Sequence, residues 1–399
     1  MIDRISVEQC TLCGSCYNAC PVDAISFKTL YLDFLYPAID NSRCVGCDRC
    51  EKSCPILADK QEPESGYPIA FAARIRDEEA RRKSSSGGVF YELASKILSE
   101  GGYICGAVFD DHFHVKHIVS NTQKDLYRMM GSKYAQSDMG MCFRQIKTLL
   151  DEGKNVLFTG CPCQVAGLRT YIGRKHPNLL LVELICHGIP SDQMLQTYIG
   201  MQEKKYGSRL KEMEFRNKAK GWHNSSVRME FANHRLYAET IGSDTYMKGF
   251  LGSTFLKPSC YQCHFRNYAA GSDIVLGDFW GAEVEHTAED DNKGLSAVLV
   301  NTEKGFASLN KCMLMIVPTS VEKIVKYNMN LVQSAGKSPL RSEFYAYAEE
   351  NGYESAIRCF LEEKLIDKAI RRGRFVLRYA WHLSLIHISE PTRLRCISY

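Results

Sequence analysis

Eight cysteines near the N-terminus form two matched runs whose spacing is suited to iron–sulfur chemistry. In each run three cysteines are two residues apart, a fourth follows after three more residues, and a proline comes next. The two runs are Cys10, Cys13, Cys16 and Cys20, and Cys44, Cys47, Cys50 and Cys54. Such a loop can hold three corners of a [4Fe–4S] cube, while the fourth cysteine reaches a second cube. The runs therefore predict two [4Fe–4S] clusters.

The crossing of the fourth cysteine predicts which thiols share a cluster. One cluster is expected on Cys10, Cys13, Cys16 and Cys54, and the other on Cys20, Cys44, Cys47 and Cys50. Zinc is the alternative, because two Cys-x2-Cys pairs can bind it. Zinc would use two Cys-x2-Cys pairs per site. Each run instead has three closely spaced cysteines, then a fourth cysteine followed by proline, and this pattern favours the cubes. Residues 1–58 resemble bacterial two-cluster ferredoxins, which implies an α+β module that transfers electrons.

Four later cysteines also lie in turn-like segments. Cys163 and Cys186 each follow a short apolar run, and Cys260 and Cys263 form a Cys-x2-Cys pair. The first two fall at the carboxyl ends of predicted strands, where α/β sheets place ligands. Four thiolates are what a third cube needs. Two other interpretations stay open from the residues alone: cysteines buried in the core, or a zinc half-site or redox pair.

The segment SSSGG precedes a predicted helix at residues 88–98 and could bind an anion. Hydroxyl groups, glycine backbone and a helix N-terminus together form a cradle for phosphate, such as that of a dinucleotide. The alternative is an ordinary serine cap before a helix. The residues that would form the cradle are Ser85, Ser86, Gly87 and Gly88.

The elements that position these residues alternate between strand and helix. Apolar runs predict strands at 69–75, 103–109, 155–159, 179–185 and 274–276, and helices at 88–98 and 165–171. This order predicts an α/β domain. Residues 59–68 are polar, with two prolines and a glycine, and predict a linker. After Asn301 the apolar spacing becomes helical, with two amphipathic helices around Asn351 and a helical region over 321–382.

The bulk composition excludes several classes of protein. The 399 residues can form two or three domains, and the 45% apolar and 24% charged content is ordinary for a globular chain. A net charge of +4 gives no electrostatic argument for nucleic acid. We find neither an apolar run long enough to span a membrane nor a secretory signal. We therefore expect a cytoplasmic protein whose 18 cysteines are reduced and available to metals.

The final segment, residues 383–399, differs in character from the rest of the chain. Its string LSLIHISEPTRLRCISY resembles a conceptual translation of a sequencing-library adapter. We expect it to be an artefact and exclude it from the fold prediction, as one would a fusion scar.

Seven ordered blocks between residues 68 and 310 resemble the beta subunits of coenzyme F420 hydrogenases and dehydrogenases, in the bacterial form with a fused ferredoxin module. The blocks are KSSSGGVF, GSKYAQSD, FTGCPCQVAGLR, ICHGIP, FRNKAKGWHNSS, CYQCHF and SDIVLGDFWG. The resemblance implies an N-terminal part of the family domain over 69–150 and a C-terminal part over 151–320. It also implies that this α/β domain binds FAD and one [4Fe–4S] cluster.

The resemblance extends to individual residues. It implies flavin contacts from Ser85, Ser86, Gly87 and Gly88, and also from Lys133, Tyr134, Gln136 and Ser137. It implies that the third cluster is bound by Cys163, Cys186, Cys260 and Cys263. The family commonly has another residue where this chain has Cys161, so Cys161 is an alternative to Cys163. Asp278 and Trp280 belong to a matching block, and their role stays open.

The expected function follows from the expected cofactors. Clusters transfer single electrons and a flavin accepts two, so the pair couples hydride chemistry to a one-electron path. We expect an FAD-dependent iron–sulfur oxidoreductase that connects a redox partner protein or ferredoxin with a small organic substrate, coenzyme F420 being one candidate. The alternative is a non-catalytic electron-carrier subunit of a larger complex. No catalytic residue can be named from the sequence.

Overall fold

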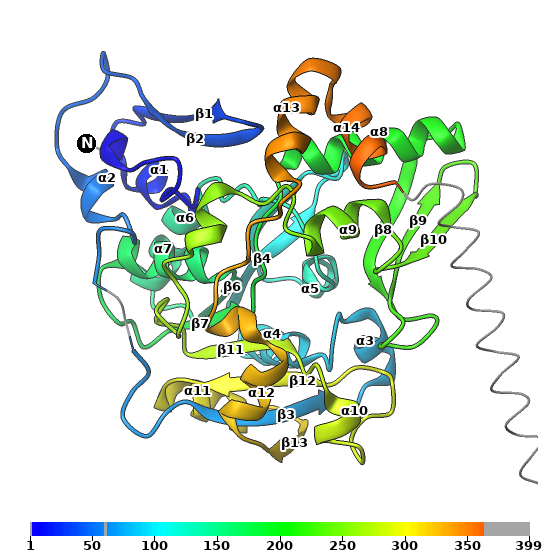
Figure 1. The fold of residues 1–399 in the computed structure, drawn as a ribbon. Coiled ribbons are helices and arrows are strands. Elements are labelled where there is room, and N and C mark those ends of the chain that lie inside the picture. Colours follow the sequence, from blue (N-terminus) through cyan, green and yellow to red (C-terminus); the bar gives the residue numbers. More distant parts are fainter. Residues whose placement is uncertain (1, 60–61, 363–399) are drawn as a thin grey trace, which may run out of the picture.

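The computed structural model describes residues 2–59 and 62–362, and it places a small N-terminal module against a larger α/β unit (Figure 1). The predicted helical segment beyond residue 362 and the segment 383–399 lie outside the described residues. Within the described ranges, no helix is both long and apolar enough to cross a membrane.

The N-terminal module is built from two short helices and a hairpin. Helices α1 (Ser15–Ala19) and α2 (Arg49–Lys52) each begin inside a cysteine run. Strands β1 (Ile25–Tyr31) and β2 (Phe34–Ile39) pair antiparallel. Strand β1 directly follows the first cysteine run. The segment between the two runs is well packed, because Phe34 and Tyr36 of β2 are buried against the larger unit.

The larger unit is organised around a mixed sheet of eight strands in the order β13-β3-β12-β11-β7-β6-β4-β5. Neighbours among β11, β7, β6 and β4 are parallel, and all the other neighbours are antiparallel. The strands are β3 (Ile69–Ile75), β4 (Tyr103–Phe109), β5 (Val115–Ser120), β6 (Val156–Gly160), β7 (Leu179–Leu184), β11 (Ile274–Asp278), β12 (Ser296–Val300) and β13 (Leu314–Pro318). The sheet joins strands from 69–150 with strands from 151–320, so these two parts form one α/β unit.

Helices cover both faces of this sheet. One face packs against α4 (Val89–Ser99), α5 (Gln123–Met129) and α11 (Glu303–Asn310). The other face packs against α6 (Cys142–Asp151), α7 (Pro162–Ile172), α10 (Ala282–Glu285) and α12 (Val321–Tyr327). The central strands are apolar along their whole length because both of their faces are buried. The short helix α3 (Glu78–Lys83) leads into the serine–glycine loop.

A second layer packs beside the large sheet. It contains a three-stranded antiparallel sheet of β8 (Leu210–Asn217), β9 (Ser226–Phe231) and β10 (Leu236–Thr240). Four helices accompany it: α8 (Asp192–Tyr206), α9 (Thr245–Leu251), α13 (Arg341–Asn351) and α14 (Tyr353–Phe360). The predicted helix pair around Asn351 is confirmed. The expectation that the chain is helical throughout after Asn301 is wrong at β13, which pairs with the edge of the large sheet.

Candidate redox site

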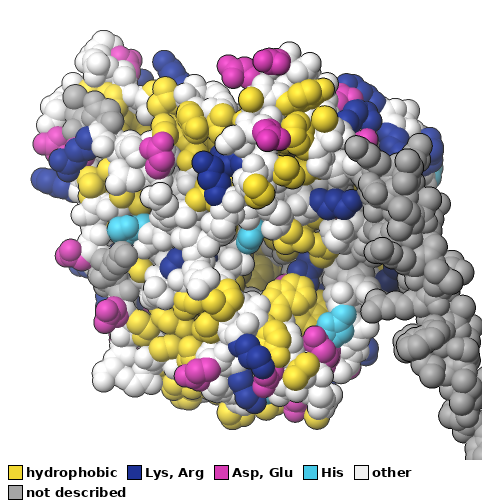
Figure 2. Space-filling model, viewed as in Figure 1, with side chains coloured by type: hydrophobic (Ala, Val, Ile, Leu, Met, Phe, Trp, Pro, Cys, Tyr) yellow, Lys and Arg dark blue, Asp and Glu magenta, His cyan; other side chains and the backbone are white. Residues whose placement is uncertain are grey.

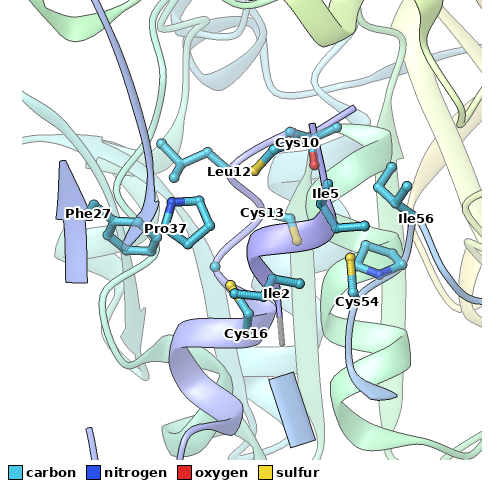
Figure 3. Close-up of a pocket in the computed structure, with 13 residues that line it drawn as sticks. Ile2, Ile5, Cys10, Leu12, Cys13, Cys16, Phe27, Pro37, Cys54 and Ile56 are labelled. Atoms are coloured by element: carbon cyan, nitrogen blue, oxygen red, sulfur yellow. The ribbon is translucent and has the colours of Figure 1, made fainter. Parts of the chain in front are cut away.

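Two cavities in the N-terminal module are lined by the two cysteine quartets that the crossing predicts. The first cavity is lined by Cys10, Cys13, Cys16 and Cys54, together with apolar side chains such as those of Ile2, Ile5 and Ile56 (Figure 3). The second is lined by Cys20, Cys44, Cys47 and Cys50. Each cavity therefore combines three thiols of one run with the fourth thiol of the other. We call the sets the first and the second quartet.

The first quartet lies in surroundings that disfavour free thiolates. Burial, together with the neighbouring thiols of Cys54 and Cys10, raises the pKa of the Cys13 thiol to about 12. Burial and the same neighbours raise the pKa of Cys16 as well. Four thiolates this close in apolar surroundings need positive charge between them, which iron supplies as it displaces their protons. The donor set therefore fits an iron–sulfur cube.

The spacing of the sulfur atoms argues against zinc. A tetrahedral zinc with bonds of about 2.3 Å would hold its sulfurs about 3.8 Å apart. Among the described residues, no three cysteine sulfurs lie within 4.8 Å of one another, and the one compact group of metal-ligand type is His223, Glu283 and Asp290. A cube bonds each thiolate through a different iron corner, so it accommodates a wider spacing.

The structure also brings together the four later cysteines that the sequence singles out. Cys163 lies in the first turn of α7 and Cys186 follows β7. Cys260 lies within the short helix η2 (Pro258–Gln262), and Cys263 follows it. Burial raises the pKa of the Cys163 thiol, and the other three thiols raise it further. We call these four cysteines the core group.

A fifth thiol lies beside the core group. The Cys161 and Cys186 side chains are hydrogen-bonded, and this bond is the largest cause of the raised pKa of Cys161. The helix predicted from residue 165 begins three residues earlier, because Pro162 suits a first helical position and the Gln164 side chain accepts from the Cys161 backbone N–H at 2.9 Å. This start puts Cys163 at a helix N-terminus, which favours a thiolate.

The first quartet lies directly against the larger α/β unit. A Cβ atom added to Gly167 of α7 would lie 3.0 Å from the Cys13 sulfur, so a larger residue there would displace Cys13 by a few tenths of an ångström. Cys13 also contributes to the raised pKa of Cys163, after burial and two closer thiols. In the second quartet, by contrast, Cys47 is exposed. The three cysteine sets therefore run from the surface of the module to the end of the large sheet.

Hydrogen bonds from the larger α/β unit fix the orientation of the N-terminal module. From α6, Arg144 donates to the backbone oxygens of Asn18 at 2.7 Å and of Cys20 at 2.5 Å, and it pairs with Asp23 at 2.7 Å. From α7, Thr170 donates to the Ser53 backbone oxygen at 2.6 Å. The module is thus attached beside both cysteine runs.

The serine–glycine loop lies between α3 and α4 and is shaped by contacts with the sheet. The Ser86 hydroxyl donates to the Leu295 carbonyl at 2.7 Å, and the Gly87 N–H donates to the Ser296 hydroxyl at 2.9 Å. A Cβ on Gly87 would lie 2.3 Å from the Ala73 carbonyl oxygen, so the loop requires glycine there. Gly88 lies directly before α4, at the N-cap position, with a φ of 88°, and no side chain caps that helix. Its N-terminus therefore has no side-chain acceptor.

The second predicted flavin loop meets the first through a hydrogen bond of 2.8 Å between the Ser85 and Ser132 hydroxyls. The Lys133 amine donates to the backbone carbonyls of Met129, Met130 and Gly131 at the end of α5. Burial lowers its pKa to about 7. The hydrogen bonds of the amine are therefore already used inside the loop.

Three more predicted flavin residues point into the protein. Tyr134 packs against Phe215 and Phe250, with ring centroids 5.3 Å and 4.8 Å away. Ser137 is hydrogen-bonded to His117 Nδ1 at 2.7 Å. Gln136 is buried, and its backbone N–H donates to the Pro190 carbonyl at 2.9 Å. The Tyr134 and Ser137 side chains therefore support the loop, whereas the buried Gln136 Oε1 has no hydrogen-bond partner among the described residues.

Two cations near the serine–glycine loop were not identified from the sequence. Lys218 donates to the Ser86 backbone oxygen at 2.6 Å, which ties β8 to the loop. Arg216 pairs with Asp278 at 2.9 Å. Both residues belong to the block FRNKAKGWHNSS, which is the signal that could have indicated them.

The structure also shows what Asp278 and Trp280 contact. Asp278 accepts from Arg216 and from the Trp222 indole N–H at 3.0 Å. Trp280 is 37% exposed and stacks parallel on Trp222 with ring centroids 5.5 Å apart. The block SDIVLGDFWG therefore contributes to a charged and aromatic cluster on β11 and the loop after it.

The fold and the cysteine sets define an iron–sulfur protein, and comparisons with known proteins agree. Residues 9–58 match the 4Fe-4S dicluster domain. Residues 70–143 match the N-terminal region and residues 153–320 the C-terminal region of the coenzyme F420 hydrogenase/dehydrogenase beta subunit. The chain belongs to this family, as its ordered sequence blocks indicated.

Two curated relatives are a dehydrogenase subunit and a reductase. The chain is 24% identical over 232 residues to one of the subunits of the F(420)H(2) dehydrogenase of Methanosarcina mazei, a match covering 55% of this chain and 64% of that protein. It is 28% identical over 166 residues to the coenzyme F420-dependent sulfite reductase of Methanocaldococcus jannaschii, covering 40% and 24% respectively. The chain thus spans less than two thirds of either relative.

A solved structure is also similar. It is a chain of the F420-reducing [NiFe] hydrogenase complex from Methanosarcina barkeri, 18% identical, with a TM-score of 0.44, covering 68% of this chain and 96% of that one.

Proposed function

We propose that this protein is an FAD-dependent iron–sulfur oxidoreductase that conducts single electrons between a redox partner protein and a flavin. The observation that carries the proposal is the order of the three cysteine sets. The second quartet reaches the surface at Cys47, and the first quartet contacts α7 through Cys13 and Gly167. Cys163 of the core group lies at the start of the same helix.

Each cysteine set has a proposed role in this path. The second quartet holds a distal [4Fe–4S] cluster that exchanges electrons with the partner, which is a ferredoxin or another redox protein. The first quartet holds a proximal cluster. The core group holds a third cluster, with Cys163 rather than Cys161 as its fourth ligand. Because each cube takes up and releases single electrons, a row of cubes suits conduction.

The FAD phosphates are proposed to lie at the serine–glycine loop. The N-terminus of α4 offers backbone N–H groups without a side-chain cap, and Ser85 adds a hydroxyl. Lys218 holds the loop in shape through the Ser86 carbonyl. Figure 2 shows a hollow near the centre of this face, between α9 and α12, surrounded by apolar side chains with Lys and Arg among them. Such a lining suits a planar ligand with phosphates.

The proposed substrate is a small organic hydride donor or acceptor of the class of coenzyme F420. The names of two relatives contain this coenzyme, and both are redox proteins. When bound, the flavin would exchange a hydride with such a molecule and single electrons with the core cluster. The protein contributes the positions of the loops and the exclusion of water.

The test of flavin binding uses Ser85→Asp, which places a negative charge where phosphate is proposed to bind. We expect the variant to lose flavin and to keep its iron. The matched control is Ser99→Asp at the other end of α4, where the side chain is exposed. Flavin retained in Ser85→Asp at the level of the control would refute this loop as the phosphate site. Bleaching of the flavin by reduced coenzyme F420 under argon then tests the substrate.

A second candidate is an electron-carrier subunit without flavin. It is favoured by the inward direction of Lys133 and Ser137, whose side chains already have partners inside the protein. Anaerobically purified protein that holds iron but releases no flavin on denaturation would select this candidate.

A further inference from the structure

Lys257 is a buried cation between the N-terminal module and the core group. Its side chain is 1% exposed. The ammonium donates to the Leu35 carbonyl of β2 at 3.0 Å and lies 3.8 Å from the centre of the Tyr36 ring. Among the described residues, no carboxylate forms an ion pair with it. Since an unpaired buried charge is costly, a lysine at this position calls for an explanation beyond packing.

The backbone of Lys257 belongs to the core group's own segment. Its N–H donates to the Ile189 carbonyl at 2.8 Å, and its carbonyl accepts from the Cys260 N–H at 2.9 Å. The residue thus bridges two parts of the molecule: its main chain shapes the turn that carries Cys260, and its side chain holds the hairpin of the module.

Lys257 lies beside thiols of both sets. Cys10 and Cys260 pack against the same apolar cluster as Tyr36, whose ring the ammonium contacts, and the Lys257 main chain is hydrogen-bonded to Cys260. Burial lowers the pKa of Lys257 to about 8, and Cys10 and Cys260 oppose this fall. Cys10 belongs to the first quartet and Cys260 to the core group. One ammonium therefore lies within electrostatic reach of both proposed clusters.

We propose that the positive charge of Lys257 raises the reduction potentials of the proximal and core clusters together. The inference rests on the proposed function. A one-electron donor, such as the partner protein or dithionite, adds one negative charge to a cluster. In each onward step the proximal cluster loses that electron and the core cluster gains it. A cation between the two stabilises either reduced cluster, most strongly where water is excluded.

The core group has a second cation beside it, Arg266. Arg266 donates to the Cys186 carbonyl at 2.6 Å and lies near Cys263. The core cluster therefore keeps one positive neighbour when Lys257 is neutralised. We expect the proximal cluster to depend more strongly on Lys257 than the core cluster does.

The experiment is an anaerobic redox titration of the full chain, followed by electron paramagnetic resonance. Lys257→Met and Lys257→Gln remove the charge, and Lys257→Arg keeps it. An exposed lysine in an ion pair on β8, replaced as Lys211→Met, is the control. The neutral variants should shift the midpoint potentials of the proximal and core clusters to more negative values. The potential of the distal cluster should not move, and Lys257→Arg and Lys211→Met should titrate like the unmodified protein.

The outcomes separate this inference from the proposed function. Absence of cluster signals in the unmodified protein would refute the proposed function. Clusters that are present but keep their potentials in the neutral variants would overturn the role of Lys257 alone. Loss of iron from both neutral variants, or an equal shift in Lys257→Arg, would overturn it in favour of a purely structural role.

Discussion

At the scale of single residues, the strongest prediction concerns the crossing of the fourth cysteines. If Cys54 belongs to the first quartet, Cys13→Ala and Cys54→Ala should abolish the same cluster and leave the same remaining resonance signal. Cys20→Ala and Cys47→Ala should leave the other signal. Each variant should lose about four irons per chain. Cys54→Ala and Cys47→Ala leaving identical spectra would contradict the crossing.

The residue scale also shows what a sequence can and cannot indicate. The two quartets were predictable because their ligands are cysteines at fixed local spacing, and the structure groups them as that spacing requires. Lys257 and Arg216 were not predictable in the same way. Lys257 contacts Leu35, 222 residues away, and Arg216 pairs with Asp278, 62 residues away. Nothing in the sequence next to either residue indicates these contacts.

At the scale of elements, the approach of α7 to the module depends on Gly167. In Gly167→Ala the new Cβ would press on Cys13, so we expect a loss of about 1–3 kcal/mol of stability and an altered signal from the proximal cluster. Gly200→Ala on α8 is the matched control, because no atom lies within 4 Å of its added Cβ. That control should be neutral or more stable by up to about 1 kcal/mol. Anaerobic denaturant unfolding measures both, and equal effects would contradict the contact.

Helix α6 attaches the module through Arg144, and its removal should loosen the module. Arg144→Met loses hydrogen bonds from a charged group, which is a cost of about 1–3 kcal/mol. Amide hydrogen exchange should accelerate across residues 9–58 while the large sheet keeps its protection. Lys147→Met on the same helix is the control, since Lys147 forms an exposed pair with Asp151. Unchanged exchange in Arg144→Met would show that other contacts attach the module.

Strands were predicted from sequence where both faces of the strand are buried. The apolar runs that predicted β3, β4, β6, β7 and β11 lie in the large sheet, where both faces are covered. Strand β2 was missed because Pro37 interrupts its pattern, and its burial comes from the larger unit. The sheet of β8, β9 and β10 was missed because one side is exposed and its strands carry many charged residues.

At the scale of the whole molecule, the arrangement of the three cysteine sets could not be predicted from sequence. It depends on how the module packs on α6 and α7, which are contacts between segments over 100 residues apart, as between Arg144 and Asn18. We expect that the core cluster can be lost while the two clusters of the module remain. Cys260→Ala should lower the iron content by about a third, keep both module signals, and stop electron transfer from dithionite-reduced module clusters to the flavin. Flavin reduction at the normal rate in this variant would exclude the core group from the path.

The central claim is that the chain conducts electrons through iron–sulfur clusters bound by its cysteine sets. The most direct measurement is the iron and acid-labile sulfide content of anaerobically purified, folded protein. Three cubes predict about twelve irons and about twelve sulfides per chain. About eight of each would leave only the two module clusters, and a colourless, iron-free protein that is properly folded would contradict the account.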